Sequence, residues 1–146
     1  SLASKASILL FDGFPMYKKN DLLFRLVSRE KISLLGVSAK YIDSLKKLNL
    51  KIKNKINLKN LKVICSTGSP LSKDGFEYIY NNVKKNVHLA SISGGTDIVS
   101  CFVLGNIYQP VYSEEIQGNG LGLDVKVFSE KGKSRINKKG ELVWKE

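Results

Sequence analysis

The chain has 146 residues, a length typical of one domain or of part of a larger one. Hydrophobic residues make up 42% of it and charged residues 25%, and no apolar run approaches the roughly 20 residues of a membrane span, so we expect a soluble, globular protein with no membrane partner. The N-terminus lacks a signal-peptide pattern, and the two cysteines lack metal-ligand spacing. We therefore expect a cytoplasmic protein with free, buried thiols.

The net charge of +11 raises the question of nucleic-acid binding. Of the 24 basic residues, 21 are lysines and three are arginines, whereas base and phosphate recognition favours the arginine fork. The chain also lacks the alternation of basic and aromatic residues that is typical of RNA-binding proteins. A lysine-rich, solvated surface is the favoured explanation, and nucleic-acid binding is the disfavoured alternative.

The first two thirds of the chain alternate between predicted strands and helices. Apolar, β-branched runs predict strands at residues 6–12, 31–36, 61–66 and 87–92. Amphipathic patterns predict helices at about 20–30, 39–48 and 72–85, the last two capped by Ser38 and Ser72, with a polar connector at 51–60. Strands separated by helices indicate parallel βαβ units.

The pattern changes after Tyr108 to short strands separated by turns. These strands are predicted at 115–117, 123–128 and 140–145, with a hairpin tip at 130–133. The predicted fold is therefore α/β, with a parallel βαβ layer and flanking helices over residues 1–107, followed by a small, mostly antiparallel β portion over 108–146. The last predicted strand has nothing to close it, so we expect a fragment of a larger domain.

The stretch LASISGGTDIVSCF (89–102) combines a strand end, two glycines, a hydroxyl and a carboxylate. Gly94 and Gly95 allow close approach of a ligand to the backbone, Thr96 can donate to a phosphate oxygen, and Asp97 can hold Mg²⁺. We expect a short helix to follow, at 98–102. From local chemistry alone, a glycine turn whose Thr or Asp caps that helix is the favoured alternative to a phosphate site.

A second glycine turn, STGSP (66–70), follows the preceding predicted strand, and together the two turns resemble a known family. The supporting motifs are FDGFP (11–15), SAKYID (38–43), ASISGGTDIVSCFVLGN (90–106), PVYSEEIQ (110–117) and GELV (140–143). They resemble the acetoacetyl-CoA synthetases, or acetoacetate–CoA ligases, of the adenylate-forming acyl-CoA synthetase superfamily. The resemblance covers about residues 9–143. STGSPL and ASISGGTDIVSCF are specific to this family within the superfamily, whereas GEL is superfamily-wide.

The resemblance implies a ligase of ketone-body and lipid metabolism that uses ATP, Mg²⁺ and CoA. Its relatives convert acetoacetate and ATP·Mg²⁺ to acetoacetyl-AMP and pyrophosphate, and CoA then displaces AMP. Hydrogen-bond donors and the metal ion stabilise the charge that moves during adenylation. No side chain need act as the nucleophile, because the carboxylate of the substrate attacks.

The resemblance also implies roles for the two turns. Asp97 stands where most of the superfamily has Glu, and we expect it to be catalytic and to hold Mg²⁺ directly or through water. A glycine replaces the tryptophan of acetyl-specific synthetases at Gly94, which leaves room for a longer acyl group. The remaining implied roles are adenine and nucleotide binding by Gly68, Ser69, Pro70, Ser93 and Gly95, α-phosphate binding and catalysis by Thr96, and acyl binding by Thr67 and Gly94.

The sequence departs from the family pattern in several places. Ser93 replaces the usual aromatic residue and removes a stacking partner for adenine, Glu114 replaces a common Gly, and residues 144–146 replace Cys-Thr and prolines. The phosphate loop should lie before Ser1, and the ribose-binding segment and the lid domain with its catalytic lysine after Glu146. We therefore expect this chain to need the rest of a parent chain for activity. The alternative is a non-catalytic nucleotide-binding module.

Overall fold

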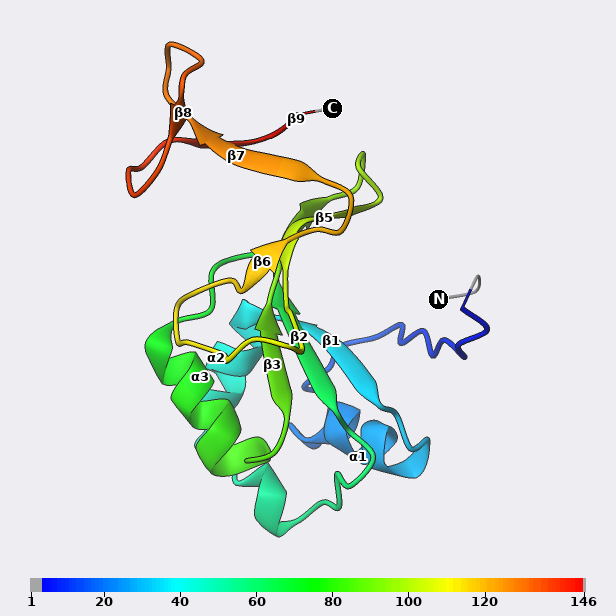
Figure 1. The fold of residues 1–146 in the computed structure, drawn as a ribbon. Coiled ribbons are helices and arrows are strands. Elements are labelled where there is room, and N and C mark those ends of the chain that lie inside the picture. Colours follow the sequence, from blue (N-terminus) through cyan, green and yellow to red (C-terminus); the bar gives the residue numbers. More distant parts are fainter. Residues whose placement is uncertain (1–3, 146) are drawn as a thin grey trace.

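A computed structural model describes residues 4–145 and consists of three small sheets with helices around the first (Figure 1). The first sheet is parallel, in the order β1-β2-β3, and is formed by β1 (Leu34–Ser38), β2 (Val63–Thr67) and β3 (His88–Ser91). The helices are α1 (Leu22–Arg29), α2 (Ala39–Lys47), η1 (Ile52–Asn54), α3 (Lys73–Tyr78) and η2 (Ile79–Val83). The predicted parallel βαβ layer is confirmed.

The other two sheets are antiparallel and extend away from the parallel sheet (Figure 1). One has the order β4-β5-β6 and is formed by β4 (Ser93–Gly95), β5 (Ser100–Leu104) and β6 (Gly118–Asn119). The other has the order β8-β7-β9 and is formed by β7 (Asp124–Phe128), β8 (Ser134–Arg135) and β9 (Glu141–Lys145). The antiparallel portion is therefore confirmed, while the division at residues 107/108 stays a prediction.

Serine side chains begin α2 and α3 as the sequence predicts. The Ser38 Oγ accepts a hydrogen bond from the Tyr41 backbone N–H at 3.1 Å, and the Ser72 Oγ accepts one from the Gly75 N–H at 3.2 Å. Each bond satisfies a backbone donor that has no partner inside the helix. The Ser38 cap lies directly at the carboxyl end of β1, and the Ser72 cap lies at the end of the loop that follows β2.

The hydrophobic core lies between the parallel sheet and its helices. Its most buried side chains are Phe24, Val27, Ile42, Leu45, Ile52, Leu61, Ile64, Phe76, Ile79, Val83 and Leu89, each no more than 2% exposed. They come from α1, α2, η1, α3, η2, the loop before β2, and the strands β2 and β3, so this core holds the parallel layer and its helices together. Among residues 4–145, no helix is long and apolar enough to cross a membrane.

A lysine side chain fixes the loop that leads into β2. The Lys84 ammonium donates to the carbonyl oxygens of Leu58 and Leu61 at 2.6 Å and to that of Lys59 at 3.3 Å. Burial, together with the charge of Lys62, lowers the pKa of Lys84. The contact ties the end of η2 to the segment that positions β2.

Several sequence predictions of local structure are wrong. Residues 6–12 form no strand, because within the described chain they have no partner with which to form a ladder. The predicted strand at 31–36 lies at Leu34–Ser38 instead, and the strand at 115–117 is replaced by the short β6. The helix predicted at 98–102 is absent. Residues 98 and 99 end a turn and residues 100–102 begin the strand β5, where β-branched and aromatic side chains favour an extended, paired backbone.

Other predictions hold with shifted ends. The helix expected at 72–85 is divided into α3 and the π-helical η2, and the connector at 51–60 contains the short η1. The predicted hairpin tip is a turn, in which the Gly132 N–H donates to the Ser129 carbonyl at 2.8 Å. Among the terminal residues that depart from the family pattern, Glu146 lies outside the described residues.

Replacing Tyr78 by Phe is expected to lower the free energy of unfolding by about 1 kcal/mol. The hydroxyl of this buried residue donates to the Leu50 carbonyl at 2.6 Å, and burial raises its pKa to about 12. Because the folded pKa is raised, the contribution is fully present below about pH 10 and is lost as the pH rises through about 12. Urea unfolding at pH 8 and pH 11 should show the difference between wild type and Tyr78→Phe narrowing at the higher pH. Tyr108→Phe, which changes a side chain that is 90% exposed, should leave stability unchanged at both.

Candidate functional site

The two glycine loops of the sequence leave neighbouring strands at the same edge of the parallel sheet. Ser66 of β2 is paired in register with Ser91 of β3, and the Ile92 N–H donates to the Ser66 carbonyl at 2.8 Å. The segments 67–70 and 93–97 therefore both begin at the carboxyl ends of adjacent parallel strands. Open α/β sheets bind their ligands at this edge.

The first loop is fixed at both ends and open between them. Thr67 is the last residue of β2, and Leu71 is buried directly before the Ser72 cap of α3. Gly68 has φ +84°, a conformation that other residues rarely adopt, and a β-carbon at this position would meet nothing within 4 Å. The loop thus presents exposed backbone and the side chains of residues 67–70 to solvent.

The second loop is a β-hairpin, so Thr96 and Asp97 do not cap a helix and that alternative is wrong. The turn at its tip closes with a hydrogen bond from the Val99 N–H to the Thr96 carbonyl at 3.1 Å. Val99 has φ +51°, a strained conformation for a β-branched residue. The strain lies in the turn that displays the predicted phosphate and metal ligands.

Gly94 and Gly95 differ in the space around them. A β-carbon on Gly94 would collide with the Ser100 carbonyl oxygen and lie 2.7 Å from the Cys101 Cα, whereas one on Gly95 would meet nothing within 4 Å. Gly94 is paired with Cys101 across the hairpin, and the register shifts between Ser93 and Gly94. Gly94 is therefore required for the two hairpin strands to pack.

The Asp97 carboxylate fits a Mg²⁺ ion whose remaining ligands are oxygen atoms of the substrate and of water. In the part of the chain that the structure describes, no three His, Cys, Asp or Glu residues are grouped as a metal site, so Asp97 is a single exposed carboxylate. Mg²⁺ commonly takes one or two carboxylates together with phosphate oxygens and waters. Asp97 could fill the carboxylate position beside a bound nucleotide.

The predicted site residues share one further property. All nine residues of segments 67–70 and 93–97 are exposed, and the hollow formed by residues 6–11, α1 and β1 contains none of them. The structure brings the two loops to one edge but does not enclose them. Their individual roles stay predictions.

Two free thiols lie beside these loops, and their position could not be recognised from the sequence. Cys65 is half-buried on β2, and burial, with Cys101 nearby, raises the pKa of its thiol. Cys101 lies opposite Gly94 on β5. The one sequence signal for Cys101 is its position inside the family-specific motif ASISGGTDIVSCF.

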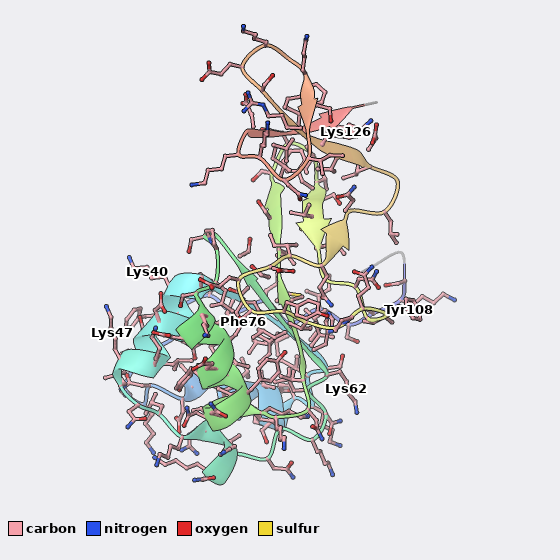
Figure 2. The ribbon with its side chains drawn as sticks, turned by 60° about the vertical axis from the view of Figure 1, so that its left-hand side comes forward. Lys40, Lys47, Lys62, Phe76, Tyr108 and Lys126 are labelled. Carbon is pink, nitrogen blue, oxygen red and sulfur yellow. The ribbon has the colours of Figure 1, made fainter. Side chains whose placement is uncertain are left out.

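The lysines are spread over the molecule. Lys40 and Lys47 on α2, Lys62 before β2 and Lys126 on β7 are all exposed and project from different parts of the structure (Figure 2). The distribution favours a solvated surface over a continuous basic groove along one element.

Comparison with curated proteins gives strong matches to acetoacetyl-CoA synthetases. An acetoacetyl-coenzyme A synthetase from Rhizobium meliloti (strain 1021) is 49% identical over 142 residues, which are 97% of this chain and 22% of the relative. An acetoacetyl-CoA synthetase from Gallus gallus is 44% identical over 143 residues, 98% of this chain and 21% of the relative. No family model matches the chain.

Comparison with solved structures also finds similarity to acyl-CoA synthetases. The acetoacetyl-CoA synthetase from Streptomyces lividans superimposes with a TM-score of 0.82 at 32% identity, over 91% of this chain and 21% of that chain. An anthranilate CoA ligase, AuaEII, in complex with anthranoyl-AMP, shares the fold alone, with a TM-score of 0.80 at 17% identity over 95% of this chain and 26% of that chain. The chain spans about a fifth of the length of the curated relatives it matches.

A parallel βαβ layer with glycine loops at its carboxyl edge, joined to small antiparallel sheets, thus matches the fold of adenylate-forming acyl-CoA synthetases. Within that class, both the sequence and the fold of this chain are similar to a segment of the acetoacetyl-CoA synthetases. The predicted family resemblance is confirmed.

Proposed function

We propose that this chain supplies part of the nucleotide and acyl sites of an acetoacetate–CoA ligase. That enzyme would activate acetoacetate with ATP as acetoacetyl-AMP and transfer the acetoacetyl group to CoA. The observation that supports this most is the identity of 42–49% to acetoacetyl-CoA synthetases over nearly the whole chain. The adjacency of the two loops gives the proposal a physical basis.

The chemistry of the loops suits adenylation. The Thr96 hydroxyl would donate to the α-phosphate, and Gly68, Ser69, Pro70, Ser93 and Gly95 would border the nucleotide. Asp97 would hold Mg²⁺, which neutralises phosphate charge when bound. Donors fixed in place before the reaction stabilise developing charge without reorganising.

We further propose that the chain needs additional protein segments to catalyse the reaction. We also propose that the protein acts in the cytoplasm, where free thiols persist. Every predicted site residue is exposed, whereas an acyl-adenylate must be protected from water. The chain contributes about a fifth of the length of its relatives, so the remaining walls of the site would come from the rest of the parent protein.

Calorimetric titration with ATP·Mg²⁺ and with a non-hydrolysable acetoacetyl-sulfamoyl-adenosine tests the ligand sites. Thr96→Val removes the hydroxyl donor with little change in side-chain shape and should lower the affinity for both ligands by about tenfold. Asp97→Asn should weaken ATP·Mg²⁺ by a similar factor but leave the metal-free adenylate analogue unchanged. Asp12→Asn, at an exposed carboxylate on a different segment, is the matched control and should change neither.

The outcomes separate the alternatives. Binding of ATP·Mg²⁺ without any preference for the acyl-adenylate would favour a non-catalytic nucleotide-binding module. A folded wild-type chain that binds neither ligand would contradict the proposal that the loops form a ligand site within this segment. Pyrophosphate release from acetoacetate, ATP and Mg²⁺ by the chain alone would contradict its dependence on further segments.

A further inference from the structure

Two segments rich in lysine lie at the end of the parallel sheet opposite the glycine loops. Segment 51–62 leads into the amino end of β2 and segment 79–87 into that of β3, whereas the glycine loops leave the carboxyl ends of the same strands (Figure 1). Together the two segments contain seven lysines and no carboxylate side chain. This end of the molecule therefore carries a concentrated positive charge.

Five of these lysines surround one open hollow, which we call the amino-end hollow. It has a volume of about 610 Å³ and lies between η1, the loop that follows η1 and the end of η2. Ile56, Leu58 and Val83 contribute apolar surface, and Asn54 and Asn57 contribute side-chain amides. The lysines around it are Lys53, Lys55, Lys59, Lys84 and Lys85. The hollow thus combines positive charge with groups that can hydrogen-bond to a peptide backbone.

The positive charge around the hollow is not neutralised within the described chain. None of the ion pairs formed among residues 4–145 includes a lysine of either segment. Carbonyl oxygens hold the Lys84 ammonium in place, and the charge of Lys62 lies close enough to help lower the pKa of Lys84. An anion bound here would gain several opposite charges and would relieve the repulsion between them.

The backbone around the hollow is fixed without a ligand. The Ser28 hydroxyl of α1 donates to the Asn57 carbonyl at 2.8 Å, and the Lys59 N–H donates to the Asn57 Oδ1 at 3.0 Å. The Ile56 N–H donates to the Ile52 carbonyl at 3.0 Å. Binding would therefore order lysine side chains but no loop, which keeps its entropic cost small.

The composition of the two segments narrows the kind of anion that fits. They contain no arginine, and their one Phe, Tyr or Trp residue, Tyr80, is partly buried against the core, so they offer neither a guanidinium fork nor a platform for base stacking. They also contain no exposed large hydrophobic side chain that could insert into a membrane. An extended peptide can enter an open hollow and place its carboxylates against the lysines.

We propose that the amino-end hollow is a docking site for an acidic segment of another protein. The lysine ammonium groups would pair with Asp or Glu carboxylates along that segment, and the amides of Asn54 and Asn57 would bond to its backbone. Each lysine is a point charge on a flexible stem, so the surface suits a run of carboxylates rather than one fixed geometry. Docking at the amino ends of β2 and β3 would leave the glycine loops open to substrate.

Fluorescence anisotropy of the whole chain with labelled octaglutamate tests the site, and octaglutamine is the uncharged control peptide. Reversing two charges of the hollow in Lys55→Glu/Lys59→Glu should weaken octaglutamate binding by about tenfold or more, and added salt should weaken binding to wild type. Lys40→Glu/Lys47→Glu is the matched control, because it makes the same change of net charge at exposed positions of α2. Its effect should be less than about twofold.

Acetylation of wild-type lysines by acetic anhydride gives a second readout that depends on no variant. Octaglutamate should slow the modification of Lys55, Lys59 and Lys85 but not that of Lys40, and octaglutamine should slow none of them. Equal protection of Lys40 would show that the peptide responds to net charge alone, and the proposed site would be wrong.

The remaining outcomes are equally decisive. Equal losses in the two double variants, equal affinity for the two peptides, or a folded wild-type chain that does not bind octaglutamate would overturn the docking site. Tighter binding of an oligothymidylate or of phosphatidylserine vesicles at the same salt concentration, lost in Lys55→Glu/Lys59→Glu, would replace the protein partner by a nucleic acid or a membrane. None of these results bears on ligand binding at the glycine loops, which is measured separately.

Discussion

Replacing Ile64 by Ala is expected to lower the free energy of unfolding by about 2–5 kcal/mol. Ile64 is 1% exposed and lies on β2 against the helices, where truncation removes apolar contacts and leaves a cavity. Chemical unfolding in urea would measure the loss. Because β2 leads directly into Thr67 and Gly68, the variant should also lose ligand binding at temperatures where wild type is still folded.

The neighbouring residue provides a matched control. Val63 is only half-buried and projects from the opposite face of the same strand, so Val63→Ala should cost clearly less. The conservative Ile64→Val should cost about 0.5–1.5 kcal/mol. Equal losses for Val63→Ala and Ile64→Ala would show that the two faces of β2 are equally packed, which would contradict the position of the core.

Gly94→Ala is expected to destabilise the chain by about 1–3 kcal/mol, the usual range for overpacking. Its β-carbon would collide with the backbone of β5 at Ser100 and Cys101, which cannot yield as the end of a flexible side chain could. The adjacent Gly95→Ala is the control. A β-carbon there enters open space, so this change should be neutral or slightly stabilising, because alanine restricts the unfolded chain.

Thermal and urea unfolding of the two glycine variants would test the hairpin directly. If both variants were neutral, β5 would have to stand farther from Gly94 than the structure places it. If both variants were destabilised by the same amount, a β-carbon at Gly95 would have to meet as little free space as one at Gly94, which would contradict the structure.

The sequence by itself determined the parallel layer. Apolar strands alternated with amphipathic helices, and the serine caps at Ser38 and Ser72 were recognisable because capping depends on a few neighbouring residues. The family resemblance followed from two glycine motifs of unusual composition. Those features are local, and a linear sequence shows local features directly.

Only the tertiary structure decided which extended segments became strands. Residues 6–12 have strand composition but find no partner within the described chain. Residues 98–102, predicted as helical, instead form part of a hairpin, in which the strand that starts at Ser100 pairs with Ser93–Gly95. Strand formation depends on the ladder that a distant segment supplies, and sequence pattern alone does not specify that segment. The contact between Gly94 and Cys101 has the same origin, because seven positions of sequence separate two residues that the hairpin brings face to face.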